Sequence, residues 1–143
     1  MGADCVFCRI VERQVTASHV YEDDATLAFI DLRQPNPGHV LVVPKVHVPT
    51  LDQLPLDVAA RLMQTVVLMT GAVRRSFAPD GINIWQSNGA AAGQEVFHVH
   101  MHVFPRRAGD GCLCIYPEAP PTPARTELDR LAAQLRAVIA ERS

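Results

Sequence analysis

The chain has 143 residues, with 13 basic and 15 acidic side chains and a formal charge of −2 at neutral pH. This length fits one domain with a buried core, and the near balance of charge argues against a broad nucleic-acid or membrane surface as its main function. We find no signal-like segment and no run near the roughly 20 apolar residues that span a bilayer, so we expect a cytoplasmic protein with neither a nucleic-acid nor a membrane partner.

Secondary structure in the first half of the chain is predicted from turn residues and apolar alternation. A short turn or helix is expected over residues 5–11, followed by strands over 20–22 and 26–31 that form a hairpin. The prolines and glycine of 34–38 predict a loop, and a third strand is expected over 39–43.

The second half begins with a helical pattern. Apolar residues recur every three or four positions over 55–77, which predicts one long helix. Strands are expected over 83–87 and 98–104, joined by a glycine-containing loop. A proline-rich connector over 116–123 then leads to an amphipathic C-terminal helix, with Thr122 as the expected cap and Pro123 in its first turn. Its apolar stripe is Leu128, Leu131, Leu135 and Ile139.

Five strands without a βαβ alternation indicate an α+β domain with a mainly antiparallel sheet, a long central helix and a C-terminal helix. We expect residues 1–143 to form one domain, with a core over 5–107 and a C-terminal extension over 108–143.

Residues 98–104 read His-Val-His-Met-His-Val-Phe, with a histidine at every second position. In an extended strand, His98, His100 and His102 would share one face at roughly 6.6 Å intervals. Pro105 lacks a backbone donor, so we expect the strand to end there or to lie at an edge.

Three neighbouring imidazoles disfavour each other's protonation, so at least one is expected to be neutral near pH 7. A neutral imidazole is a nucleophile or general base, and a protonated neighbour is a general acid. The same row of histidines could equally bind a metal ion.

This histidine run resembles the signature of the histidine-triad (HIT) superfamily, and it carries the Gly93-Gln94 and Pro105-Arg106 flanks common there. Further blocks resemble family blocks in the same order, so that the resemblance covers roughly residues 5 to 107. These blocks are residues 5–10, 21–24, 27–31, 37–45 and 88–89. The resemblance implies a HIT-like fold, most similar to bacterial Hint-like hydrolases.

The resemblance also implies a catalytic mechanism. His100, the middle histidine, would attack the α-phosphorus of a purine nucleotide conjugate and form a nucleotidyl-histidine that water resolves. His102 would lie by the leaving group as a hydrogen-bond donor and possible acid. Periodicity alone makes His39 an ordinary strand-end histidine, whereas the resemblance places it beside the triad, where it would help to set the triad's protonation.

The family pattern implies a nucleotide site of three parts. An aspartate would accept hydrogen bonds from the ribose hydroxyls, apolar neighbours would form a base pocket, and the loop before the triad would contact or order itself around phosphate. The implied nucleotide-binding residues are Phe29, Ile30, Asp31, Leu32, Asn88, Gly93, Gln94 and Glu95.

Glu95 departs from the pattern, because Hint-like and Fhit-like members have serine or threonine there. An ionised carboxylate cannot donate a hydrogen bond and repels phosphate. Glu95 would therefore turn away from the phosphate or select a leaving group that carries a positive amine.

Four cysteines form two close pairs, which is sparse for a disulfide scaffold and typical of thiols or metal ligands in a reducing compartment. Cys5 and Cys8 have the spacing of half a zinc site. The resemblance implies that His47 and His98 complete a structural Zn²⁺ site; the alternative is two buried thiols and a solvated His47. The other pair, Cys112 and Cys114, is interpreted as packing residues.

The overall prediction is a nucleotide-binding hydrolase or transferase of the nucleoside phosphoramidase type, which the family implies is a homodimer formed through the long helix and the neighbouring strand. One alternative is a dinucleoside polyphosphate hydrolase of Fhit-like type. Others are a metal-dependent hydrolase with the triad as ligands and a non-catalytic nucleotide sensor.

Overall fold

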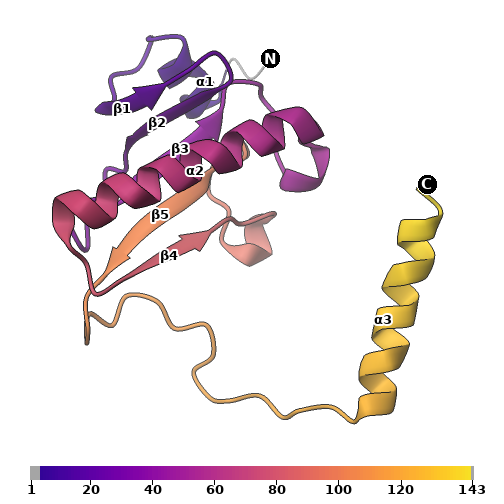
Figure 1. The fold of residues 1–143 in the computed structure, drawn as a ribbon. Helices are drawn as coiled ribbons and strands as arrows, with labels where there is room; N and C mark the ends of the chain where they lie inside the picture. The colour runs from indigo at the N-terminus through magenta and orange to yellow at the C-terminus, as the bar shows by residue number, and fades with distance from the viewer. Residues whose placement is uncertain (1–3, 143) are drawn as a thin grey trace. The chain divides into compact units, whose positions relative to one another are not determined.

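The computed structural model describes residues 4–142. The chain divides after Cys112 into two compact units, each described by itself. The helices and strands of the first unit are α1 (Val6–Val11), β1 (His19–Glu22), β2 (Thr26–Ile30), β3 (Val40–Pro44), α2 (Leu56–Phe77), β4 (Gly81–Trp85) and β5 (Met101–Arg106), with short 3-10 turns at Leu51–Gln53 and Ala90–Ala92 (Figure 1).

The five strands form one sheet in the order β1-β2-β3-β5-β4, and every neighbouring pair is antiparallel. The predicted α+β fold with an antiparallel sheet is therefore confirmed. Strand β5 lies between β3 and β4, so that His102 is opposite Leu41 on one side and Trp85 on the other.

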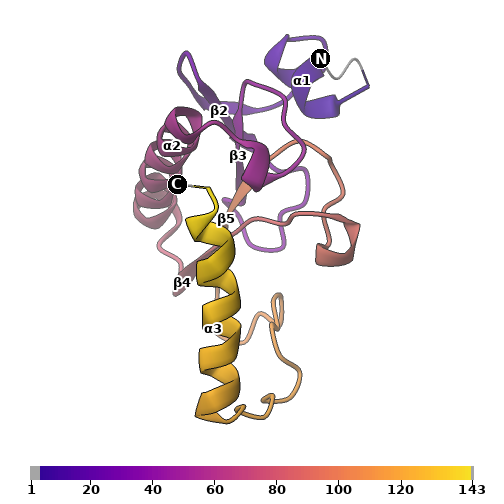
Figure 2. The ribbon, with the colours of Figure 1, turned by 90° about the vertical axis from the view of Figure 1, so that its right-hand side faces the viewer.

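Each face of the sheet is covered by a helix (Figure 2). The buried stripe of α2, including Leu62, Val66 and Met69, packs with Val42 and other residues of the central strands. The opposite face carries a second core, in which α1 packs against β2 and β3. Because both faces are covered, the central strands are buried on both sides, and their side chains have fixed positions.

Helix α2 is also long and apolar enough to cross a membrane by length and composition, although no such stretch was predicted. One of its faces packs against the sheet, as a core helix does. The other face exposes apolar side chains, including Met63, Val67 and Leu68.

The histidine run differs from the prediction at both ends. Strand β5 begins only at Met101, so His98 and His100 precede it. The strand does not end at Pro105 but continues to Arg106. Pro105 is tolerated there because the β3 pairing already stops at Val103, which leaves only β4 as a strand neighbour.

The second unit contains α3 (Arg125–Ala140). It begins two residues after Pro123, which was predicted to lie in the first turn, and its cap is Ala124 rather than Thr122; Ala124 makes no side-chain hydrogen bond. None of its described side chains is buried, and its apolar stripe is exposed. Whether the whole chain behaves as a single domain stays a prediction.

Candidate active site and metal cluster

A cavity of about 430 Å³ opens between α1, β2 and the segment that follows β2. Four of the predicted nucleotide-binding residues line it: Phe29, Ile30, Asp31 and Leu32. Leu32 is 99% exposed, which puts it at the mouth of the cavity rather than in its wall. The cavity walls are mainly apolar, which suits a flat heterocyclic base.

Helix α1 contributes a wall that the sequence did not predict. Phe7 lines the cavity and meets Phe29 edge-on, with ring centroids 5.5 Å apart. Phe7 also lies edge-on to His100 at 5.0 Å. The candidate catalytic histidine is not among the residues that line the cavity, but the Phe7 ring contacts it and lines the cavity. The position of Phe7 between Cys5 and Cys8 was the available signal.

His100 is held in one tautomer by the backbone. Its Nδ1 donates to the carbonyl oxygen of His98 at 2.7 Å, because a carbonyl can only accept. In the neutral ring, Nε2 therefore carries a lone pair. Burial lowers the pKa of His100, so the neutral form is favoured near pH 7.

A second chain of hydrogen bonds orders His39 and His102. Nδ1 of His39 donates to the carbonyl oxygen of Arg33 at 3.1 Å, which makes Nε2 of a neutral His39 an acceptor. That Nε2 lies 2.9 Å from Nδ1 of His102, which must then donate. His102 therefore presents a lone pair on Nε2 when it is neutral.

Packing around His102 favours this neutral state. Trp85 stacks on the His102 ring, with centroids 4.1 Å apart and an interplanar angle of 9°. Burial is the main cause that lowers the pKa of His102 to about 3, and it also lowers the pKa of His39. The free site accordingly contains no imidazolium at neutral pH that could protonate a leaving group.

Asp31 is buried beside this chain, with Oδ2 3.9 Å from Nδ1 of His39. Asp31, His39 and His102 could be considered as metal ligands, because their donor atoms lie close together. The two histidine nitrogens are 2.9 Å apart, however, closer than the roughly 3.3 Å edge of a tetrahedral zinc site with two nitrogen ligands. A hydrogen bond explains this spacing better than a shared ion does.

The residues of the loop before the triad order the backbone. Gln94 is buried; its Oε1 accepts from the amide of Gly89 at 2.7 Å, and its Nε2 donates to the carbonyl of Pro49 at 2.7 Å. Asn88 accepts from the amide of Leu51. Neither side chain is among the residues that line the cavity, and the same holds for Gly93, whose φ of 84° suits glycine.

Glu95 does not line the cavity but faces a residue that does. Nη2 of Arg33 lies 2.7 Å from Oε2 of Glu95, and Nη1 lies 3.3 Å from Oε1, so the pair is bidentate. The Arg33 guanidinium lowers the pKa of the Glu95 carboxyl, which is therefore ionised at neutral pH. No pattern in the sequence joins these residues, which are 62 positions apart.

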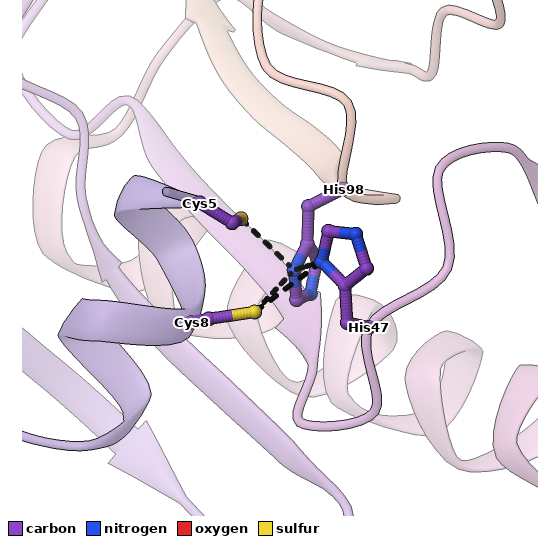
Figure 3. Close-up of side chains that lie close together, drawn as sticks. All are labelled: Cys5, Cys8, His47 and His98. Atoms are coloured by element: carbon purple, nitrogen blue, oxygen red, sulfur yellow. Dashed lines mark hydrogen bonds between the residues drawn. The ribbon is translucent and has the colours of Figure 1, made fainter. Parts of the chain in front are cut away.

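At the other end of the histidine run, His98 lies in a cluster with Cys5, Cys8 and His47 (Figure 3). Nδ1 of His98 lies 3.5 Å and 3.6 Å from the two sulfurs and 3.2 Å from Nδ1 of His47, which in turn is 3.3 Å from Sγ of Cys8.

These separations fit the edges of a tetrahedron. With Zn–S near 2.3 Å and Zn–N near 2.05 Å, neighbouring donors lie roughly 3.3 to 3.6 Å apart. Nε2 of His98 donates to the carbonyl of Pro44 at 2.8 Å, which leaves Nδ1 free of its proton to bind a metal. The four residues thus fit a Cys₂His₂ site by distance and by donor chemistry.

The architecture and the histidine run agree with the comparison to known families. The HIT domain model matches residues 12–109. This chain belongs to the HIT family.

The similarity to relatives and solved structures of the family extends beyond residues 12–109. Adenylylsulfatase HINT3 of Arabidopsis thaliana is 37% identical over 132 residues, which are 92% of this HIT chain and 66% of the plant protein, so the chain spans slightly less than two thirds of that relative. A HIT family protein from Bacillus anthracis has a TM-score of 0.90 at 33% identity and covers 96% of this chain and 99% of its own.

A zinc-bound histidine triad family protein from Mycobacterium smegmatis is also similar, with 37% identity, a TM-score of 0.71 and coverage of 94% of this HIT chain and 97% of its own. That protein is zinc-bound, and the present chain brings together Cys5, Cys8, His47 and His98, whose donor atoms could hold a metal ion.

Proposed function

We propose that this HIT protein is a nucleotide-binding hydrolase that cleaves purine nucleotide conjugates at the α-phosphate through a nucleotidyl-histidine at position 100. The observation that carries the proposal is the 2.7 Å hydrogen bond from Nδ1 of His100 to the carbonyl of His98. It fixes the Nε2 lone pair of a buried, neutral imidazole beside a base-sized cavity.

In the first step, Nε2 of His100 attacks phosphorus and the N–P bond forms. The bond from phosphorus to the leaving group breaks with its electron pair going to the leaving group, which departs as an anion or as an amine that has taken a proton from the solvent. In the second step, water attacks phosphorus, the N–P bond breaks, and the water's proton passes to the solvent. The Nδ1–H···O=C bond strengthens while the attached imidazole carries positive charge.

The cavity supports the assignment of the nucleoside. We propose that Phe29, Ile30 and Leu32 bind the purine together with Phe7, and that the buried carboxylate of Asp31 accepts from the ribose hydroxyls. Gln94, Asn88 and Gly93 are proposed to order the phosphate loop, which the hydrogen bonds of Gln94 to two backbone segments support.

The proposed substrates are nucleoside phosphoramidates or related conjugates. His39 and His102 are proposed to hold each other's tautomer and to face the leaving group. Because His102 is neutral in the free site, leaving groups that depart without a proton, such as a sulfate or a phosphate, are suited to it. Adenylylsulfatase HINT3, a relative of this chain, is named for such a substrate.

The four-residue cluster is proposed to hold a structural zinc ion through Cys5, Cys8, His47 and His98. Bound there, the metal would supply a crosslink between α1, the segment after β3 and the start of the histidine run, since four protein ligands leave no position for water. The ligands thereby position Phe7 and the carbonyl of His98.

We also propose a homodimer formed through α2 and β4. The exposed face of α2 carries Val67, which is 66% exposed, together with Met63 and Leu68, and the edge strand β4 exposes Ile84. Val67→Glu should convert the protein to monomers in analytical ultracentrifugation, and an unchanged sedimentation coefficient would contradict this interface.

The function is tested by comparing adenosine phosphoramidate, an acyl-adenylate and a dinucleoside polyphosphate side by side, with His100→Ala as the control. The proposal predicts turnover of the first two classes that depends on His100. Turnover of the dinucleoside polyphosphate alone would support the Fhit-like alternative, and turnover without His100 would exclude the proposed intermediate.

A further inference from the structure

We propose that Arg33 recognises an anionic leaving group and that Glu95 occupies the Arg33 guanidinium until such a group binds. This inference rests on the proposed function and assigns a specificity-determining residue to the same site. The recognised class is a nucleoside 5′-phosphate joined to a group that carries its own negative charge, such as sulfate or a further phosphate.

Arg33 is placed for this role by the segment after β2, which also contains Asp31. Among the described residues that line the cavity, Arg33 is the only one with a permanent positive charge. Its backbone carbonyl accepts from His39, and its Nε lies 3.9 Å from Oδ1 of Asp31. The segment that carries the guanidinium is therefore held by contacts to Asp31, the proposed ribose ligand, and to His39.

The charges of the pair reach the reacting groups. Burial is the main cause that lowers the pKa of His102, and the charge of Arg33 adds to it. The pKa of the Glu95 carboxyl is lowered mainly by Arg33 and, to a smaller extent, by the charge of His100. A phosphorus atom at Nε2 of His100 would therefore have its leaving group within the field of both side chains.

The ion pair between Arg33 and Glu95 can be replaced by a contact between Arg33 and a bound anion. The side chains of Arg33 and Glu95 are 68% and 67% exposed, so no packing locks them together, and exposed ion pairs hold weakly. A guanidinium binds sulfate or phosphate oxygens with the same two-point geometry that it uses for a carboxylate. An incoming anionic group can replace the carboxylate at Arg33, whereas a neutral amide cannot.

The arrangement also accounts for the carboxylate at position 95. Facing the phosphate alone, Glu95 would repel it; paired with Arg33 through two contacts, its charge is compensated. The ionised carboxylate then disfavours anions that bind without the correct geometry for Arg33.

The test compares adenosine 5′-phosphosulfate with adenosine 5′-phosphoramidate, whose leaving groups differ in charge. Turnover is measured as kcat/KM, and affinity is measured by calorimetry in a His100→Asn background that cannot form the proposed intermediate. Arg33→Gln should lower the sulfate-to-amide ratio about tenfold in both measurements, Arg33→Lys should lower it less, and Glu95→Gln should raise it.

Two further variants make the result decisive. In Arg33→Gln/Glu95→Gln the loss should persist, because the recognising group is still missing; a return to the original ratio would show that Glu95 alone selects the leaving group and would overturn the proposal. Arg61→Gln, which breaks the ion pair between Arg61 of α2 and Asp24 in the turn between β1 and β2, should leave the ratio unchanged.

The proposed function and this inference fail differently. Turnover that survives in His100→Asn contradicts the nucleotidyl-histidine. The ratio of the affinities for the sulfate and the amide still tests the role of Arg33 in that case. Turnover through His100 with a ratio that Arg33→Gln does not change contradicts the role of Arg33 alone. Failure of both compounds to bind contradicts both.

Discussion

His98 and His100 are two residues apart in one motif, yet their rings face different partners. Both are buried, and both use a backbone carbonyl to fix a tautomer. His98 donates from Nε2 and directs Nδ1 toward two thiols, whereas His100 donates from Nδ1 and keeps Nε2 for the substrate side. The choice of nitrogen, made by the backbone, separates the proposed metal ligand from the proposed nucleophile.

The comparison also shows how the two regions are linked. The carbonyl that orients His100 belongs to His98, and Phe7 from α1 contacts both rings edge-on. The proposed metal cluster and the proposed reacting histidine are therefore neighbours that are linked through the His98 carbonyl and the Phe7 ring, although the His100 ring is not a member of the cluster. The following predictions separate them.

The largest effect is expected for His100→Asn. Loss of the attacking nitrogen should reduce turnover by at least about 10³-fold. The cluster does not use the His100 ring, so bound zinc per chain, measured by plasma emission spectroscopy, should stay at the wild-type level. Zinc loss in this variant would contradict the separation of the two regions.

Removing two cysteines of the cluster should affect zinc binding and stability more than kcat. Cys5→Ser/Cys8→Ser should abolish stoichiometric zinc and lower Tm by on the order of 5 °C, because α1 loses its crosslink. KM should rise more than kcat falls, since α1 contributes a cavity wall through Phe7. If chelators or this variant removed kcat as completely as His100→Asn, the metal-dependent alternative would be favoured.

A smaller effect is expected from the neutral state of His102. Burial lowers the pKa of His102 to about 3, so as the pH falls this residue takes up a proton at a higher pH in the unfolded chain than in the folded protein. The stability from this group is complete above pH 6.5 and is lost between pH 6.5 and about 3. Urea unfolding of His102→Gln should therefore show a shallower loss of stability between pH 6.5 and 4.

The matched control is His19→Gln, since His19 is exposed on β1. This control should keep the wild-type slope of stability against pH. Equal slopes for wild type and His102→Gln would show that the neutral state of His102 does not contribute to acid sensitivity.

The smallest effect is expected at a structural ion pair away from both regions. Asp110 accepts from Nε and Nη2 of Arg106 and from Nδ2 of Asn36, and the Arg106 guanidinium holds the pKa of Asp110 well below its usual range. Asp110→Asn should lower Tm by about 3 °C at pH 7 without changing kcat. The difference from wild type should shrink as the pH falls through the lowered pKa, because protonation removes the same charge.

Much of the fold followed from the sequence because its patterns are local. The periodicity of α2 identified its buried stripe, including Leu62 and Val66, and apolar alternation located the strands. The start of β5 was wrong because alternation cannot show that the chain before Met101 turns His98 toward the cysteines. The boundary depends on contacts with residues more than 50 positions away.

Site residues that belong to a known motif could be predicted from the sequence, and the other site residues could not. The structure gathers Cys5, Cys8, His47 and His98, as the resemblance implied, but their metal occupancy stays a prediction. Phe7 and Arg33 were missed, because one is a single apolar residue in a six-residue helix and the other acquires its role from Glu95 across the fold. The cytoplasmic location also stays a prediction.

The central claim is that the Nε2 atom of His100 forms a transient bond to the nucleotide's phosphorus. The most direct measurement is rapid quenching of wild-type protein with an adenylyl substrate, followed by mass spectrometry of the peptide that contains the histidine run. The account predicts an adenylyl group on His100 within the first turnover and none in His100→Asn. Full substrate consumption with no adduct on His100, or with an adduct on His102 instead, would contradict it.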